Sequence, residues 1–505
     1  MRKFFKTVAI VSIFSISEKI LGFLYRIFLS RKIGSEGIGL YQVALSVFGL
    51  IYTLCCSGVP ITVSRLMAKY NALNDKTRVQ KVITAGLLLT LITTIPVCTL
   101  FFILGDKTAF LFTDQRSLKI FLVILPGLIF TCIYSVLRGV FWGNKDFLPY
   151  SIIELLEEIC MIVVGIILVN LSTDVFQGAF GAGVAVLISY LLSFALSVIL
   201  FFIRKNKLKN PFSELPPLIR SATPVSAMRT ASSLTTSLVS IILPLRLVQA
   251  GFSQTQAIKA FGYTVGQALP ILTIPTTLIG SFTLVLIPEI SENFYNNKHY
   301  YLKRDVEKAI KFTSVLTLLF VPVFFVCGEE IGVLLFGEYE CGKYVTTTCF
   351  LMIFISISSI STSILNSMGQ ETKTMLYYLL GGVLMLACVW FLPSVCGVYS
   401  LIVGFTCIYG LTATLNLIAI NKNCKLKPKY KGFLIRACLT ALPSILFGLM
   451  LEKLLLATLG TFFTLVVCAI LIVAFNTLMF FGFGLITFKG AFAKIKTLIF
   501  KQKLA

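Results

Sequence analysis

The chain has 505 residues, of which 57% are hydrophobic and 13% are charged. Soluble domains carry about 25% charged residues, so this composition excludes a soluble globular protein and indicates an integral membrane protein. The net charge of +23 would suggest a nucleic-acid partner in a soluble protein. Here the cations cluster in short loops between apolar runs, where they set topology and contact membrane lipids, so no nucleic-acid partner is expected.

The cysteines and the histidine give no sign of a metal site. The fourteen cysteines are scattered through apolar segments without a C-x-x-C motif, which is typical of small packing residues in helices. The single histidine, His299, lies in a polar stretch. The sequence therefore predicts no metal, no disulfide framework and no cofactor.

Apolar runs of about 20–30 residues follow one another along the chain, and each is long enough to cross a membrane. The first run follows Met1–Lys6 and continues past the length of a signal peptide without a cleavage site, so it is interpreted as a retained helix. The pattern predicts an all-α polytopic membrane protein of about fourteen spans. Their centres lie near residues 20, 52, 93, 130, 162, 190, 234, 272, 320, 356, 384, 408, 444 and 474.

Loop cations predict the orientation of these spans. Successive loops lie on opposite sides of the membrane, and roughly 29 loop lysines and arginines fall on one side against 8 on the other. The richer side holds the N-terminus. Both termini are therefore expected in the cytoplasm, which requires an even number of spans. The expected location is the plasma membrane.

The chain also contains an internal repeat. "SGVPITVSRLMAKY" at 57–70 resembles "VLIPEISENFYNN" at 285–297, and "FWGNKDFLPY" at 141–150 resembles "SMGQETKTMLYY" at 367–378. Both pairs have nearly the same spacing, which predicts two six-helix lobes related by a parallel repeat. The expected division is an N-terminal lobe at 1–210, a C-terminal lobe at 211–425, and two extra helices with a basic cytoplasmic tail at 426–505.

Cations within or near the spans are functional candidates, because a charge in hydrocarbon is costly. In the first span, Lys19 and Arg26 lie about 20° apart around the helix. Arg246 lies in the seventh span, the repeat partner of the first, so these three residues are expected to line a water-filled cavity that receives an anionic guest. Arg65 lies near the cytoplasmic end of its helix, where interfacial anchoring is the favoured alternative.

Carboxylates form a second set of candidates. Glu18 precedes Lys19 in the first span, and Glu154, Glu157 and Glu158 follow one stripe of the fifth. Glu18, Glu157 and Glu158 are interpreted as charge partners or coupling residues. An internal pair with arginine or lysine and a role with substrate or ion remain alternatives for the last two.

The sequence offers no site for ATP hydrolysis. "GEYECGKY" at 337–344 matches the spacing of a phosphate loop, but Tyr344 replaces the serine or threonine that would bind Mg²⁺, and no strand precedes it. Uphill transport would therefore draw on the membrane potential, an ion gradient or consumption of the product.

Five stretches resemble the polysaccharide-flippase branch of the multidrug/oligosaccharidyl-lipid/polysaccharide exporter superfamily, and within it most the stage V sporulation protein B family. They are "SEKILGFLYRIFLSRKIGSEGIGLYQ" at 17–42, "SGVPITVSRLMAKY" at 57–70, "LRGVFWGNKDFLPYSIIELLEEI" at 137–159, "ILPLRLVQAGFS" at 242–253 and "LPILTIPTTLIGSFTLVLIPEIS" at 269–291.

The resemblance implies two bundles forming a V around a cationic cavity, which opens alternately to each side and moves an undecaprenyl-diphosphate-linked sugar. Lys19, Arg26 and Arg246 would hold the diphosphate, with Arg65 a looser match to a basic residue of the family. Glu157 fits the glutamate of the family's fifth helix. Gly34, Pro60 and Pro275 are either bending points or ordinary turn and packing residues.

The resemblance also implies a cell-wall precursor such as lipid II as substrate, with membrane lipids as further partners. It leaves open a role in the spore cortex and contact with cell-wall synthesis enzymes. A cation-coupled multidrug exporter is the alternative, although such a protein would prefer an anionic cavity. A membrane enzyme is not expected, because no large outer loop carries catalytic acids.

Overall fold

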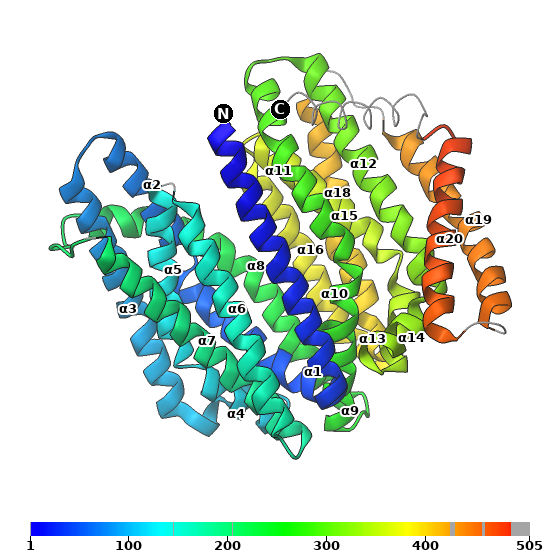
Figure 1. The fold of residues 1–505 in the computed structure, drawn as a ribbon, viewed down its shortest axis with the longest axis horizontal. Helices are drawn as coiled ribbons and strands as arrows, with labels where there is room; N and C mark the ends of the chain where they lie inside the picture. The colour runs from blue at the N-terminus through cyan, green and yellow to red at the C-terminus, as the bar shows by residue number, and fades with distance from the viewer. Residues whose placement is uncertain (1, 145, 205, 425–429, 457–459, 486–505) are drawn as a thin grey trace. The chain divides into compact units, whose positions relative to one another are not determined.

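The computed structural model describes residues 2–144, 146–204, 206–424, 430–456 and 460–485 (Figure 1). Over these residues every regular element is a helix, which confirms the all-α prediction. A membrane favours this outcome because a helix satisfies its own main-chain hydrogen bonds where no water is available. Residues 486–505, the end of the region at 426–505 predicted to hold two helices and a basic tail, lie outside the described residues.

The elements follow one another without strands across the described ranges. They are α1 (Arg2–Cys56), α2 (Val59–Ala72), α3 (Lys76–Leu104), η1 (Gly105–Leu111), α4 (Gln115–Ile124), α5 (Gly127–Gly143), α6 (Phe147–Asn170), α7 (Val175–Ile203), α8 (Leu215–Gln249), α9 (Gln254–Phe261), η2 (Gly262–Ala268), α10 (Leu269–Leu272), α11 (Ile274–Tyr295), α12 (His299–Val326), α13 (Gly328–Phe336), α14 (Tyr339–Thr348), α15 (Leu351–Ser367), α16 (Glu371–Phe391), α17 (Pro393–Cys396), η3 (Gly397–Tyr399), α18 (Ser400–Asn423), α19 (Lys431–Leu456) and α20 (Thr461–Gly482).

Each of the fourteen predicted span centres falls within a helix. Nine of the described helical segments are long and apolar enough to cross a membrane, and up to eleven are if each of two bent pairs forms one span. The protein is therefore a multi-pass membrane protein. Helix α6 is not among the nine, because Glu154, Glu157 and Glu158 lie together in it. The total of fourteen stays a prediction.

The three residues suggested as bending points lie at helix breaks. Gly34 interrupts α1 with φ 65° and ψ −176°, a conformation that is essentially restricted to glycine. Pro60 lies in the first turn of α2, and Pro275 lies in the first turn of α11. Proline is tolerated there because the first turn needs no main-chain donor. Bending at these positions stays a prediction.

The chain divides into two compact units. Unit one contains Met1–Gln267 and Leu386–Ser400, and unit two contains Ala268–Met385 and Leu401–Ala505. Helices α8 and α9 thus pack with unit one, together with a short segment from later in the chain. The predicted division at residue 210 is a different one, based on the internal repeat, and stays a prediction.

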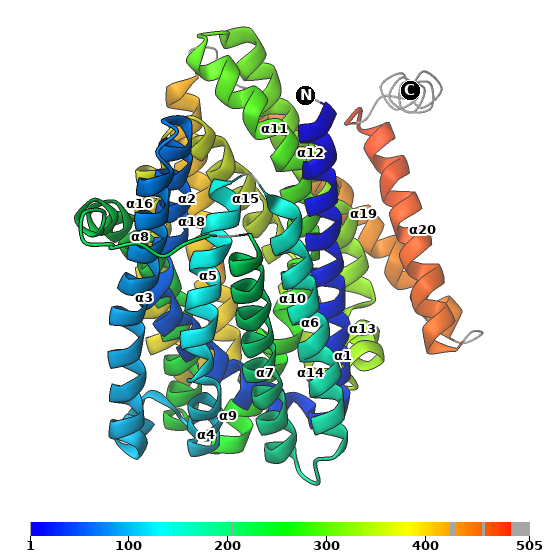
Figure 2. The ribbon, with the colours of Figure 1, turned by 60° about the vertical axis from the view of Figure 1, so that its left-hand side comes forward.

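Unit one is built around α1. Helix α1 contacts α6, α7 and α8, and Figure 2 shows α5, α6 and α7 side by side. Small residues on α7, among them Gly178, Ala182 and Ala185, are buried and let α7 approach its neighbours closely. This close packing positions the carboxylates of α6 against α1.

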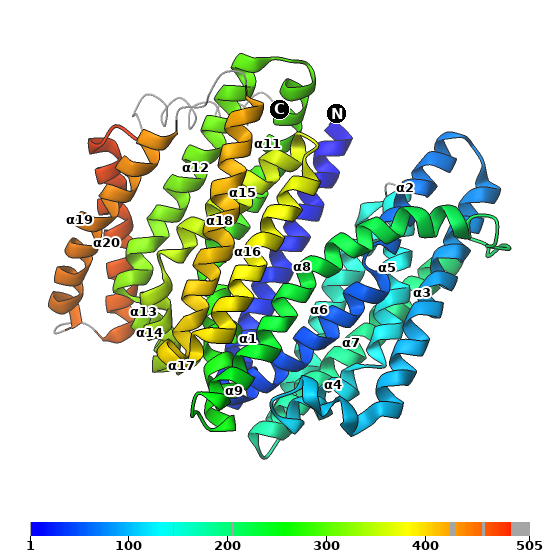
Figure 3. The same cartoon turned by 180° about the vertical axis from the view of Figure 1, so that it is seen from behind.

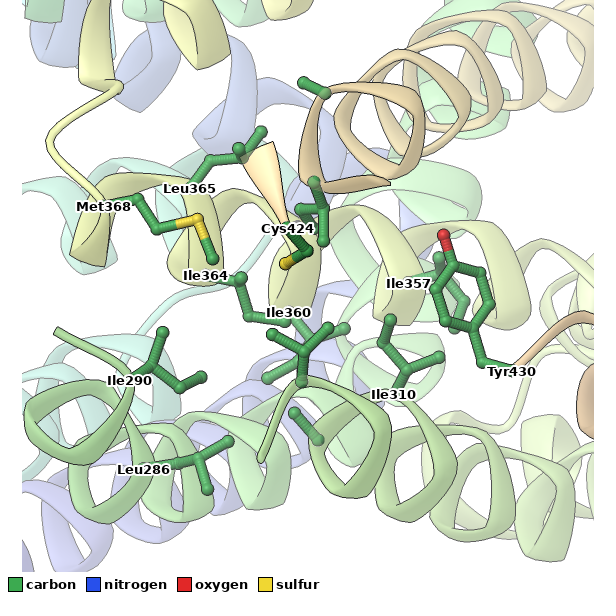
Figure 4. Packing of buried hydrophobic residues seen from close by; sticks show 14 of the residues in the cluster. Leu286, Ile290, Ile310, Ile357, Ile360, Ile364, Leu365, Met368, Cys424 and Tyr430 are labelled. Carbon is green, nitrogen blue, oxygen red and sulfur yellow. The ribbon is translucent and has the colours of Figure 1, made fainter. Parts of the chain in front are cut away.

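Unit two has its own apolar core. Helices α12, α19 and α20 contact one another, as Figure 3 shows, and α11 and α12 both contact α15. Dispersion between closely packed side chains stabilises such a core inside a membrane. Figure 4 shows buried members of this core, including Leu286, Ile290, Ile310, Ile357, Ile360, Ile364, Leu365, Met368, Cys424 and Tyr430.

Candidate functional site

Unit one contains a pocket rich in carboxylates, which we call the acidic pocket. Its volume is about 420 Å³, enough for several water molecules. Helices α1, α5, α6 and α7 provide its walls, and four glutamates face a single arginine. The lining includes Glu18, Tyr52, Tyr134, Ser135, Arg138, Glu154, Glu157, Glu158 and Tyr190.

One ion pair organises the acidic pocket. Arg138 Nη1 donates to Glu154 Oε1 at 2.8 Å, and the two side chains are 25% and 24% exposed. The Arg138 guanidinium also lies 5.1 Å from the Trp142 ring and 5.9 Å from the Tyr134 ring. These contacts hold the Arg138 guanidinium against α5 and α6 inside unit one.

The remaining carboxylates are packed differently. Oε1 of Glu18 and Oε2 of Glu157 are buried and have no hydrogen-bond partner among the described residues. Glu158 lies against Gly22 of α1, where an added Cβ would be 2.8 Å from Glu158 Oε1. A glycine at this position therefore lets a carboxylate of α6 rest directly on the backbone of α1.

Arg26 has a neutral partner. Its Nη1 donates to the main-chain carbonyl oxygen of Gly266 at 2.9 Å, and the arginine is partly buried. Gly266 belongs to η2, a π-helical turn, and such turns are rare and often occur at functional sites. Among the described residues, no ion pair with a carboxylate neutralises Arg26.

The same π-helical turn is tied to α1 on both sides of the Gly34 break. Gln267 Nε2 donates to Ser30 Oγ at 2.7 Å and to Ser35 Oγ at 3.2 Å. All three side chains are buried. These contacts hold the Gly34 break and the π-helical turn together. A change in either would therefore also change the position of Gly266, the hydrogen-bond partner of Arg26.

Arg246 lies elsewhere in unit one, near the C-terminal end of α8. Its Nε donates to the main-chain oxygen of Trp390 at 2.7 Å, and its guanidinium lies 4.8 Å from the Trp390 ring. A second donor, Nη1, contacts Gln249 Oε1. The planar guanidinium is thus held by stacking and by hydrogen bonds to neutral groups.

The other two candidate cations are exposed. Lys19 lies on α1 and Arg65 lies on α2, and both residues are exposed. Arg26 and Arg246 have different hydrogen-bond partners, and over the described ranges no hydrogen bond or ion pair links them to Lys19 or Arg65. Their role in a shared substrate site therefore stays a prediction.

Sequence reasoning found part of the acidic pocket. It grouped Glu157 and Glu158 and selected Glu18, and the structure brings all three together. It missed the contribution of α5, although a signal was available. Arg138 lies five residues before the end of α5 at Gly143, and Glu154 lies seven residues after the start of α6 at Phe147, so the two lie at similar depth in neighbouring helices.

The arrangement does not resemble a metal centre. Among the residues that the structure describes, no group of three or more histidine, cysteine, aspartate or glutamate side chains could hold a metal ion. The polar groups that unit one brings together are partly buried arginines, carboxylates and tyrosine hydroxyls.

A family model described as "Polysaccharide biosynthesis protein" matches residues 4–294, more than half of the chain. The chain belongs to this family. This polysaccharide biosynthesis family member is also similar to the stage V sporulation protein B of Bacillus subtilis (strain 168), with 26% identity over 379 residues, or 72% of each chain. It is 24% identical to the lipid II flippase MurJ of the same strain, over 61% of this chain and 60% of that relative.

Solved structures share the fold of this family member. One is described as lipid II flippase MurJ in an inward closed conformation, with a TM-score of 0.70, 15% identity, and coverage of 94% of this chain and 99% of that chain. Another is an inward-facing multidrug resistance MATE transporter, with a TM-score of 0.68, 15% identity, and coverage of 82% and 97%. Both confirm a multi-span transporter fold.

Proposed function

We propose that the chain is a flippase that moves an undecaprenyl-diphosphate-linked sugar, such as a cell-wall precursor, from the cytoplasmic to the outer leaflet. The observation that carries the proposal is Arg26, a partly buried cation of α1 whose hydrogen-bond partner is a neutral carbonyl. A buried charge without a counter-charge is costly, so a site of this kind favours an anionic guest.

The substrate chemistry fits such a cation. A diphosphate headgroup cannot cross hydrocarbon unaided, whereas its polyprenyl tail can remain in the lipid. Charge-assisted hydrogen bonds from an arginine to phosphate oxygens are short and strong. In this proposal Arg26 and Arg246 bind the diphosphate, and Lys19 and Arg65 attract it from their exposed positions.

The proposed cycle is alternating access. Gly34, Pro60 and Pro275 would act as hinges, since each lies where a helix is already interrupted. Both termini are proposed to lie in the cytoplasm, on the side rich in loop cations. The similarity to proteins named for sporulation and for lipid II flipping supports peptidoglycan or spore-cortex synthesis as the setting.

The test is headgroup translocation in liposomes that contain the purified protein and a lipid-linked precursor. Arg26→Gln and Arg246→Gln are expected to reduce translocation at least tenfold, the effect of losing about 1.4 kcal/mol of binding in the rate-limiting state. Arg436→Gln is the matched control, because Arg436 is an exposed arginine of α19. Normal translocation in both Arg26→Gln and Arg246→Gln would contradict the proposal.

The acidic pocket favours a second candidate, a cation-coupled multidrug exporter. Four glutamates against one arginine provide the negative surroundings that a cationic drug would need. The same liposomes distinguish the two functions. Export of an organic cation without movement of any lipid-linked sugar would replace the flippase with the exporter.

A further inference from the structure

The acidic pocket has more negative than positive groups. Arg138 is already paired with Glu154, and among the described residues no ion pair provides a cation for Glu18, Glu157 or Glu158. Several ionised carboxylates in one partly buried pocket repel one another, and each loses hydration. The pocket is therefore incomplete unless something positive enters it.

Polar atoms of the pocket wall also lack partners. Tyr134 is only 3% exposed, and its hydroxyl has no hydrogen-bond partner among the described residues. The same is true of Oε1 of Glu18 and Oε2 of Glu157. A buried hydroxyl without a partner is costly, so this tyrosine indicates a bound group that the carboxylates alone would not reveal.

The geometry distinguishes between a metal ion and a proton. A metal ion needs several ligands directed at one point, and no described group of three or more candidate ligands meets that need. A proton needs only one carboxylate oxygen and a nearby acceptor. A protonated glutamate becomes a hydrogen-bond donor, which would satisfy a neighbouring carboxylate or the Tyr134 oxygen.

We propose that the acidic pocket of unit one is a proton-binding site in which Glu18, Glu157 and Glu158 share at least one proton at neutral pH. The surrounding helices contribute further titratable or charged groups. These are Lys19, Tyr25, Tyr41, Tyr52 and Cys56 on α1, Cys132, Tyr134 and Arg138 on α5, Glu154 and Cys160 on α6, and Tyr190 on α7.

The proton would act on α1. Glu158 of α6 rests on the backbone of α1 at Gly22, and Glu18 of α1 lies in the same pocket. With the proton bound, α1 and α6 pack without repulsion between these two carboxylates. Without it, like charges on the two helices oppose the contact. The proton thus stabilises one position of α1.

This coupling rests on the proposed flippase function, whereas proton binding itself does not. Arg26 lies eight residues after Glu18, or about 12 Å along the same helix. A proton that holds α1 against α6 would therefore also position the arginine that we propose binds the diphosphate. A proton gradient could then drive the flippase cycle.

The chain carries a reporter for this pocket. It contains two tryptophans, and the guanidinium of Arg138 lies 5.1 Å from the ring of Trp142. A Trp390→Phe variant leaves Trp142 as the single tryptophan. Its fluorescence would be followed from pH 5 to pH 9 in detergent, in buffer without sodium or divalent cations and without any lipid-linked substrate.

The Trp390→Phe variant is the parent, and its fluorescence is expected to show a sigmoidal transition with pH. Adding Glu157→Gln is expected to abolish this transition or to shift its midpoint by at least about one pH unit. Glu292→Gln is the control, because Glu292 is an exposed carboxylate that pairs with Lys298. Glu158→Gln provides a second variant, and the infrared band of protonated carboxyl groups in the parent provides a measurement that needs no mutation.

Three results would overturn the proposal. One is a parent without a fluorescence transition and without a protonated carboxyl band. Another is a transition that remains unchanged in both glutamate variants. The third is a transition that sodium or tetraphenylphosphonium displaces, because the pocket would then bind that cation. Since no substrate is present, failure here is distinguishable from failure of the flippase proposal.

Discussion

Replacing each partner of the ion pair in the acidic pocket should have unequal effects on stability. Arg138→Gln removes the single arginine and leaves four glutamates in the pocket. We expect it to lower the free energy of unfolding by about 2–3 kcal/mol, less than for a fully buried pair because the side chains are 25% and 24% exposed. Glu154→Gln removes one of four like charges, so we expect a cost of about 1 kcal/mol or less.

The assay is SDS-induced unfolding in mixed micelles, followed by circular dichroism, with free energies obtained by linear extrapolation. Lys298→Gln is the control, because Lys298 pairs with Glu292 at the surface and its loss should cost less than about 1 kcal/mol. Equal costs for the two pocket variants, or a larger cost for Glu154→Gln, would refute this electrostatic description of the pocket.

Three further substitutions test the fold and the cations. Gly262→Ala should destabilise the protein by about 3 kcal/mol, because the new Cβ would overlap a main-chain oxygen of α1, whereas Gly49→Ala, with open space around it, should be tolerated; SDS unfolding measures both. Gly34→Ala should cost about 1–3 kcal/mol in the same assay, since its φ is 65°; an unchanged stability would argue against the observed break. Arg246→Lys should slow translocation severalfold, because lysine cannot both stack on Trp390 and donate through a planar fork; wild-type rates would contradict that contact.

The helices could be predicted because they depend on local sequence. Apolar runs of spanning length are encoded in consecutive residues, and Gly34, Pro60 and Pro275 were recognisable as potential interruptions. The glutamate stripe of α6 was equally visible, since Glu154, Glu157 and Glu158 follow helical spacing. Local pattern was enough in each case, and the structure confirms the helices.

The acidic pocket as a whole could not be predicted, because it depends on packing between helices that are far apart in sequence. Tyr134 and Tyr190 look like ordinary aromatic residues of apolar helices until α5 and α7 are placed beside α6. The contact of Arg26 with Gly266 joins residues 240 positions apart through a π-helical turn. No periodicity in either segment indicates that contact.

In the proposed flippase, the partly buried Arg26 of α1 selects a diphosphate headgroup. The most direct measurement compares translocation of two lipids that carry the same sugar and the same polyprenyl tail, one linked through a diphosphate and one through a neutral ether. We predict that the wild-type protein moves the diphosphate lipid, fails to move the neutral lipid, and loses the preference in Arg26→Gln. Equal movement of the two lipids by the wild-type protein would contradict the claim.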